Sequence, residues 1–334
     1  MDTLLLKLLE SDEPSIRYGA RLHLLNEDPL NPAMRALQAE IRACQRVKTL
    51  LSERDDQGQI PHHPYSKWNG AHWVLAALAE LHYPTGDPDL LPLRDQQYSF
   101  FFAKNLRPAR KKVVVNGQPR MCASIESNGL YTALVLDIAD GRAEKIFELL
   151  LDWQWPDGGW NCDKNPTASR SSFMETLISL RAVNLYYQRS GDPRAGQVVE
   201  QAAEVFLRRR LFRRLSNGQV MDPNFIRLHY PLYWHYDILG GLKVIAEIGA
   251  IGDPRCAEAL DLLESKRLLD GGYPSEEIFY RLGPSAKTGK SLVNWGGASQ
   301  RKMNPWVTLD ALRVLKAAGR YSVTEYIPSR LARL

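Results

Sequence analysis

The hydrophobic and polar positions of this chain follow helical spacing over most of its length. Five stretches carry apolar residues at intervals of three and four, which predicts helices with a buried face. They begin near Ala71, Cys122, Ser172, Tyr233 and Pro305. No stretch shows sustained alternation of apolar and polar residues, and only residues 113–115 have a strand-like composition, which predicts at most one small hairpin. The pattern predicts an all-α protein.

A glycine-centred turn precedes each of these five stretches. The turns lie at Gly58, Gly117, Gly158, Gly218 and Gly271, which are separated by 59, 41, 60 and 53 residues. A helical pattern also precedes each turn, as in residues 144–153, 196–211 and 257–263. Internal spacing of this kind is typical of repeated helical hairpins, in which each unit needs its neighbours to bury its apolar face.

The two helices of each predicted hairpin differ in composition. The helix before the turn is amphipathic and charged, as in residues 142–151, whereas the helix after it begins with small, aromatic or polar residues, as in 122–128. A charged face suits solvent, and a helix without one suits the interior. We therefore expect an α/α toroid, or barrel, of five to six helical hairpins, with two concentric layers of helices around a central space.

We expect a single α/α-toroid domain over residues 1–334. Helices in residues 1–55, at 15–25 and 35–51, are expected to close the ring, and residues 56–320 to supply the repeated hairpins. With 44% hydrophobic and 24% charged residues, the composition is that of an ordinary globular protein with a large core.

The net charge of +5 is mild, and we expect no nucleic-acid partner. One run, residues 208–214, concentrates arginines. We interpret it as the solvated face of a helix, with Leu207, Leu211 and Leu215 forming an apolar seam; attraction of a phosphate or diphosphate is the alternative.

We expect no secretion signal and no membrane-spanning segment. The first residues of the chain are too few and too charged for a secretion signal, and no apolar run approaches the roughly 18 residues needed to span a bilayer. The four cysteines lie far apart without a Cys-x-x-Cys pair, which indicates a reducing compartment. We expect a cytoplasmic protein.

Residues 149–160, which end in Asp157-Gly158-Gly159-Trp160, and residues 262–273, which end in Asp270-Gly271-Gly272-Tyr273, resemble a known repeat. It is the repeat of the squalene/terpene cyclase and protein prenyltransferase β-subunit superfamily. The resemblance covers most of the chain, with two well-formed repeats and three degenerate ones. It implies the toroid and a divergent bacterial prenyltransferase-like or terpene cyclase-like enzyme. Its expected substrate is an isoprenoid or similar small apolar molecule in the central cavity.

Two motifs of that superfamily are missing. The Asp-x-Asp-Asp motif with which class II terpene cyclases protonate their substrate does not occur. Residues 168–173 stand where prenyltransferases hold zinc with an Asp-x-Cys pair, and neither ligand is present there. Because a shared fold does not fix function, these departures leave the reaction open.

Candidate chemistry concentrates at the starts of the inner helices, which should converge at one mouth of the ring. We predict Asp163 and His229 as an acid–base pair, with His72 and Glu126 as neighbours. A carboxylate in an aromatic pocket has its pKa raised by desolvation, which suits a general acid. The structural alternatives are a turn cap for Asp163 and a hydrogen-bonded core histidine for His72.

Aromatic residues crowd the same joints. They are predicted to form the substrate-binding wall, because ring faces bind apolar chains and stabilise cationic centres. The alternative is a core built from large residues. The predicted wall comprises Trp73, Trp160, Tyr233, Trp234, Tyr236 and Trp306.

A zinc site is a further hypothesis. Cys122, Cys162 and His229 occupy corresponding joints, and three protein ligands with an open position suit catalytic zinc. Plain packing is the alternative, since free cysteine is often a small buried residue. Zinc would support a lyase, hydrolase or cyclase; no other cofactor is implied.

A different class of function is a non-catalytic toroid that binds a ligand or a protein partner. Residues 276–301 form a long loop, typical of lids and binding loops.

Overall fold

The computed structural model describes residues 3–102, 112–283, 285 and 288–323. Within these ranges the secondary structure is helical apart from one short hairpin, formed by β1 (Val114–Val115) and β2 (Gln118–Pro119). The prediction of an all-α protein is confirmed, and the hairpin lies where the strand-like residues stand. None of the helices in this part of the chain is long and apolar enough to cross a membrane.

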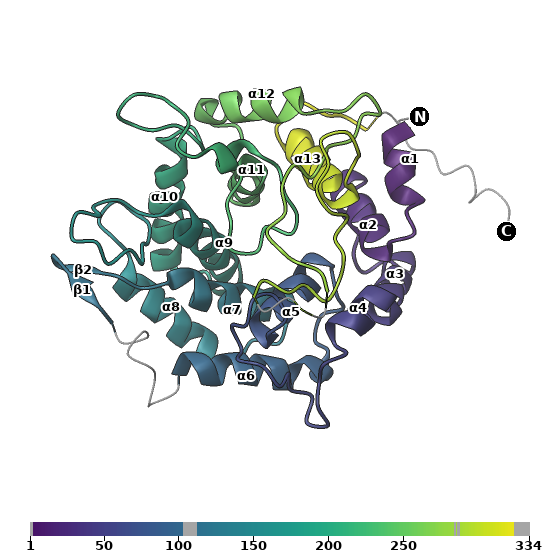
Figure 1. Cartoon of the computed structure of the whole chain (residues 1–334), viewed down its shortest axis with the longest axis horizontal. Coiled ribbons are helices and arrows are strands. Elements are labelled where there is room, and N and C mark those ends of the chain that lie inside the picture. The colour runs from purple at the N-terminus through teal and green to yellow at the C-terminus, as the bar shows by residue number, and fades with distance from the viewer. Residues whose placement is uncertain (1–2, 103–111, 284, 286–287, 324–334) are drawn as a thin grey trace, which may run out of the picture.

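The helices form two layers around a common centre (Figure 1). The outer layer contains α1 (Thr3–Leu9), α3 (Pro32–Ala43), α4 (Gln45–Leu50), α6 (Leu91–Phe102), α8 (Arg142–Trp153), α10 (Pro193–Leu207) and α12 (Ala257–Ser265). The inner layer contains α2 (Pro14–Gly19), which continues into η1 (Ala20–Leu24), and α5 (Ala71–Glu80), α7 (Ala123–Val135), α9 (Phe173–Ser190), α11 (Ile238–Glu247) and α13 (Pro305–Ala317).

Successive inner helices contact one another from α5 through α7, α9 and α11 to α13, and α13 contacts α2 and η1. Outer and inner helices alternate along the described chain in six pairs, so the predicted toroid of five to six hairpins is confirmed. Short 3-10 turns lie between some of the helices: η2 (Pro88–Leu90), η4 (Pro223–Ile226) and η5 (Pro254–Cys256).

Burial separates the two layers as the composition predicts. Outer helix α8 buries one stripe, with Ile146, Phe147 and Leu150 among its members, and leaves charged residues in solvent. Inner helix α5 buries eight of its ten residues, on all sides. A helix surrounded by other helices has no polar face to offer, which explains the compositional difference.

The five glycine turns each join an outer helix to an inner one. All five glycines have positive φ, a conformation that residues with a Cβ rarely adopt. Gly158 is also sterically required, because a Cβ there would lie 2.3 Å from the backbone oxygen of Gln201. The carboxylate of Asp157 accepts a hydrogen bond of 2.9 Å from the Ser171 amide, which ties this turn to the start of α9.

Two local predictions were wrong. α10 ends at Leu207, and Arg210 and Leu211 have positive φ, so the arginine run does not continue the helix. The inner helix expected near Tyr233 begins at Ile238, where Asp237 caps it by accepting a 2.7 Å hydrogen bond from the Gly240 amide. The preceding segment, residues 227–236, is therefore free to contribute side chains to the centre of the ring.

Candidate functional site

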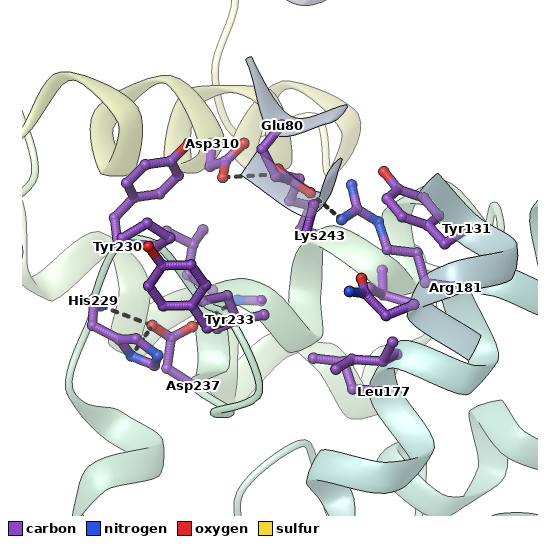
Figure 2. Close-up of a pocket in the computed structure, with 18 of the residues that line it drawn as sticks. Glu80, Tyr131, Leu177, Arg181, His229, Tyr230, Tyr233, Asp237, Lys243 and Asp310 are labelled. Carbon is purple, nitrogen blue, oxygen red and sulfur yellow. Dashed lines mark hydrogen bonds and ion pairs between the residues drawn. The ribbon is translucent and has the colours of Figure 1, made fainter. Parts of the chain in front are cut away.

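A cavity lies at the centre of the ring, between the inner helices (Figure 2). Much of its wall is apolar, from α5, α9, α11 and α13: Ala76, Ala77, Leu177, Ile178, Leu239, Val244 and Val307. The segment before α11 supplies the rest of one side, including His229, Tyr230 and Tyr233. A second cavity adjoins the first and shares Glu80, Arg181 and Lys243 with it.

His229 and Asp237 form a close pair, here called the dyad, in the cavity wall (Figure 2). Nδ1 of His229 lies 2.9 Å from Oδ2 of Asp237, and each side chain is only 1% exposed. The same carboxylate oxygen accepts a 2.9 Å hydrogen bond from the His229 backbone amide. Because the other oxygen caps α11, Asp237 ties His229 firmly to the start of an inner helix.

The second ring nitrogen of His229 is chemically available. Nε2 is buried and has no hydrogen-bond partner among the described residues, and His229 lines the cavity. Nδ1 faces two acceptors, the Arg227 backbone oxygen at 3.5 Å and the Asp237 carboxylate at 2.9 Å, so a proton on Nδ1 leaves the lone pair of neutral imidazole on Nε2. That nitrogen can therefore take a proton from a bound molecule and return it, and Asp237 stabilises the imidazolium formed in between.

Two tyrosines flank the dyad. Tyr233 stacks on Trp68 with ring centroids 4.2 Å apart, and Tyr230 stacks on Trp306 at 5.5 Å. Burial raises the pKa of Tyr233 to about 12, so its phenol stays neutral and can donate a hydrogen bond. Tyr233 also has a φ of +47°, an uncommon conformation for an aromatic residue that tends to be retained at functional positions.

An ion network connects four inner helices on the opposite side of the cavity. Lys243 of α11 lies 3.0 Å from Glu80 of α5 and 2.9 Å from Asp310 of α13. Arg181 of α9 pairs with Glu80 and with Glu247, which is also bound by Arg313.

The charges of this network balance. Three cations, from Arg181, Lys243 and Arg313, face three carboxylates, from Glu80, Glu247 and Asp310. Burial alone would raise the pKa of Glu80, but Arg181 and Lys243 outweigh it and hold that pKa well below its usual range. The carboxylate therefore stays charged near neutral pH, and the network presents no net positive charge to a ligand.

The long segment between α12 and α13 crosses the middle of the ring (Figure 1). Phe279 stacks on His235 at 3.7 Å and lies 4.8 Å from the His229 ring. Its backbone oxygen accepts a 2.9 Å hydrogen bond from the indole of Trp68. Phe279, in the loop predicted over residues 276–301, thus lies against the histidine of the dyad.

Asp163, the predicted partner of His229, lies elsewhere. It is exposed, and its carboxylate accepts a 2.9 Å hydrogen bond from the Asn165 amide, as a turn residue does. The structure pairs His229 with Asp237 instead, because Asp237 stands where the histidine segment ends and α11 begins.

His72 and Glu126 are both buried, on α5 and α7. The amide groups of Gln97 and Asn128 lie 2.8 and 2.9 Å from the two ring nitrogens of His72, which is the arrangement of a hydrogen-bonded core histidine. Neither His72 nor Glu126 is among the residues that line the central cavity.

The predicted aromatic wall divides into three groups. Tyr233 lines the central cavity, and Trp306 lines the adjoining one. Trp73, Trp160 and Tyr236 are core residues; the Trp160 indole donates to the Leu150 backbone oxygen and the Tyr236 hydroxyl to that of Leu211. Trp234 is half-buried, and its indole donates to Glu175 over 3.3 Å.

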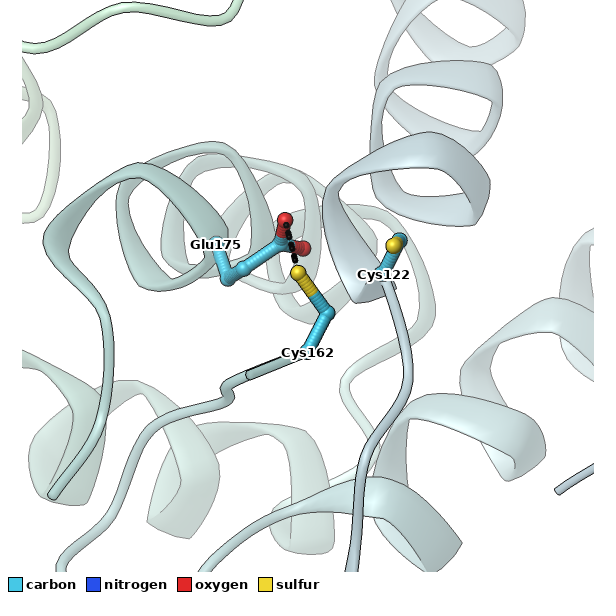
Figure 3. Close-up of side chains that lie close together, drawn as sticks. All are labelled: Cys122, Cys162 and Glu175. Carbon is cyan, nitrogen blue, oxygen red and sulfur yellow. Dashed lines mark hydrogen bonds between the residues drawn. The ribbon is translucent and has the colours of Figure 1, made fainter. Parts of the chain in front are cut away.

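Two of the predicted metal ligands come together, and the third does not. Cys122 and Cys162 lie next to Glu175, with the three ligand atoms within 4.8 Å of one another (Figure 3). His229 is absent from this group because Asp237 holds its ring in the cavity wall. A hydrogen bond with Cys122, together with burial, raises the pKa of Cys162, and burial raises that of Glu175.

No known protein-family profile matches the sequence, and no curated protein matches it. Among solved structures, the chain is similar to a polysaccharide lyase, with 9% identity, a TM-score of 0.51, and coverage of 94% of this chain and 92% of that one. A cellobiose 2-epimerase from Bacillus thermoamylovorans has 13% identity, a TM-score of 0.45 and 86% coverage of both chains. A type II terpene cyclase from Scytonema has 11% identity and a TM-score of 0.44, covering 92% and 88%. At these identities the likeness to the lyase shows the fold alone.

Sequence reasoning missed Asp237, Glu175 and the ion network. Asp237 precedes a predicted helix, which is the position of a capping residue. Inner helix α11 carries Lys243 and Glu247, and inner helix α13 carries Asp310 and Arg313. Charges within helices that are otherwise largely buried signal buried partners. Glu175 carries no comparable signal, because an acidic residue in a first helical turn is ordinary.

Proposed function

We propose that this protein is an enzyme that moves a proton to or from a neutral, mostly apolar substrate in the central cavity. His229 is the catalytic residue through Nε2, and Asp237 is its positioning residue. The proposal rests on Nε2 of His229. This nitrogen is buried and has no hydrogen-bond partner among the described residues, and His229 lines the cavity. The other ring nitrogen lies 2.9 Å from the Asp237 carboxylate.

The apolar side chains of the cavity wall support an apolar substrate. Alanine, leucine, isoleucine and valine side chains from four inner helices face the cavity, and contact with them favours hydrocarbon over sugar. An isoprenoid or a molecule of similar character fits this wall, to which Tyr233 adds an aromatic ring with an uncharged phenol.

The charge balance supports a neutral substrate. A diphosphate group requires a surplus of positive charge, and the three cations of the network are already matched by three carboxylates.

The position at which the substrate gains or loses a proton must also suit an imidazole as its acid or base. Since imidazolium is too weak an acid to protonate an isolated alkene, a carbonyl-activated or hydroxyl-bearing position suits it better.

A binding panel tests the substrate class. We expect farnesol and geranylgeraniol to bind at least about tenfold more tightly than their diphosphates, and a neutral disaccharide to bind more weakly still, by calorimetry. Ala76→Phe, which fills the cavity from α5, should abolish binding of the alcohols. Tighter binding of the diphosphates, or binding that Ala76→Phe leaves unchanged, would contradict the proposal.

A further inference from the structure

We propose that Cys122, Cys162 and Glu175 form a zinc site at the rim of the central cavity. The three side chains come from three separate segments: the residue before α7, the loop after the Gly158 turn, and the first turn of α9 (Figure 3). Their ligand atoms lie within 4.8 Å of one another. This inference does not depend on the role proposed for His229.

The spacing of the group suits tetrahedral zinc. Sγ of Cys162 lies 3.4 Å from Oε1 of Glu175. Zinc binds thiolate sulfur at about 2.3 Å and carboxylate oxygen at about 2.0–2.2 Å, so two such ligands in tetrahedral geometry lie about 3.5 Å apart. The existing separation of sulfur and oxygen therefore matches that of two atoms sharing one zinc ion.

Neighbouring groups already orient the carboxylate. Glu175 is 1% exposed; the Ser124 amide donates to its Oε2 over 2.8 Å, and the Trp234 indole donates to Oε1 over 3.3 Å. Hydrogen bonds of this kind fix the direction of a metal-binding carboxylate. These donors are neutral, so a divalent cation between the carboxylate and the two thiols would compensate a charge that is costly to bury.

The donor set favours zinc over magnesium or calcium. Two thiolate sulfurs and one oxygen form a borderline-soft set, whereas magnesium and calcium take oxygen ligands. Three protein ligands leave the fourth position open to water or a substrate atom. Cys122 is exposed, which gives the ion a route of entry.

The position of the cluster relative to the cavity follows from α7 and α9, because both helices also contribute residues to the cavity wall. Asn128 and Tyr131 of α7, and Leu177 and Ile178 of α9, line the cavity. Each lies within about two and a half helical turns of the cluster residue at the start of its helix, at 5.4 Å per turn. A zinc ion at the cluster would therefore stand where the same two helices open toward the cavity.

Metal analysis with matched variants tests the site. Protein purified without chelators should contain about one zinc per chain, and chelator-treated protein should recover it in competition with a chromophoric chelator. Cys122→Ser and Cys162→Ser should weaken zinc binding on the order of 100-fold or more, and Glu175→Gln should weaken it as well. Cys44→Ser, at a half-buried thiol outside the cluster, should bind zinc as the wild type does.

Cobalt substitution provides a readout of the ligands themselves. Cobalt-loaded wild-type protein should show a thiolate-to-metal charge-transfer band that weakens by about half in Cys122→Ser. Because Cys122 is exposed, this variant remains decisive even if Glu175→Gln fails to fold. Reduced wild-type protein that binds zinc no better than Cys122→Ser would overturn the proposal. So would a Cys122–Cys162 disulfide that forms readily in protein whose reduced state takes up no metal.

Discussion

Oδ2 of Asp237 lies 2.9 Å from both Nδ1 and the backbone amide nitrogen of His229. One carboxylate oxygen thus holds the ring and the main chain of the same histidine, while the other oxygen caps α11 through Gly240. The position of the His229 ring in the cavity wall is therefore set by the start of an inner helix. This coupling between helix capping and side-chain orientation is what makes His229 a candidate for proton transfer.

The ion network should stabilise the folded protein because each of its charges has a partner of opposite sign. Lys243→Met leaves the carboxylates of Glu80 and Asp310 without their shared cation, so we expect the free energy of unfolding to fall by about 3–5 kcal/mol. Urea denaturation measures this change. Lys112→Met removes a pair with Asp152 whose side chains are 42% and 52% exposed, and should cost about 1 kcal/mol or less. Equal losses in the two variants would argue against a stabilising network.

Stability should fall in mild acid because of His82. Burial, together with the cations of the network, lowers the pKa of His82 to about 4, whereas an unfolded histidine titrates near 6.5. As pH falls, the unfolded chain takes up the proton first. The stabilising contribution is therefore full above pH 6.5 and is lost progressively down to about pH 4.

His82→Gln removes this titration. The free energy of unfolding, measured between pH 7 and 4.5, should then depend less steeply on pH, by up to ~3 kcal/mol over the window. A slope remains, because burial also lowers the pKa of His23 far below its usual range and that of His235 to about 3. An unchanged slope in His82→Gln would show that His82 is protonated in the folded protein.

Two of the repeated turns should differ in their tolerance of a side chain. Gly117→Ala places a Cβ at positive φ with no atom within 4 Å, and should cost about 1 kcal/mol. Gly158→Ala adds a contact of 2.3 Å with the Gln201 backbone, and should cost about 3 kcal/mol or more. Thermal denaturation of both variants checks the ranking, and a smaller effect at Gly158 would contradict the packing described for this turn.

The fold could be predicted from the sequence because its signals are local and repeated. The glycine turns mark where outer helices end, and the charge of α8 against the apolar character of α5 marks the two layers. The prediction failed where tertiary contacts decide the boundary. Helical spacing continues past Leu207 in the arginine run, but the chain turns at Arg210 and Leu211.

The site could be predicted only in part. Crowding of polar and aromatic residues identified the segment that carries His229 and Tyr233, and both line the cavity. Which carboxylate would face the histidine depends on three-dimensional packing, and the prediction of Asp163 rested on its place just past a turn at the expected mouth of the ring. Glu175 joins two cysteines that are 40 residues apart, which no local pattern reveals.

A matched pair of carboxylate variants separates the two candidate partners of His229. Asp237→Asn keeps a helix cap but removes the negative charge from Nδ1, so the rate of proton transfer should fall on the order of 10²- to 10⁴-fold. Asp163→Asn changes an exposed turn residue, and activity should stay within about twofold of the wild type. A large loss in Asp163→Asn with little in Asp237→Asn would restore the pair predicted from sequence.

Solvent deuterium exchange tests the central claim most directly, because it detects proton transfer before any product is known. The protein is incubated in D₂O with the alcohols that bind in the cavity and with the corresponding aldehydes, and the mass of each ligand is followed over time. We predict deuterium uptake at a carbon-bound position of at least one ligand with the wild type, and loss of that uptake in His229→Gln. Uptake that persists unchanged in His229→Gln, or bound ligands that never take up deuterium, would contradict a proton-transfer role for His229.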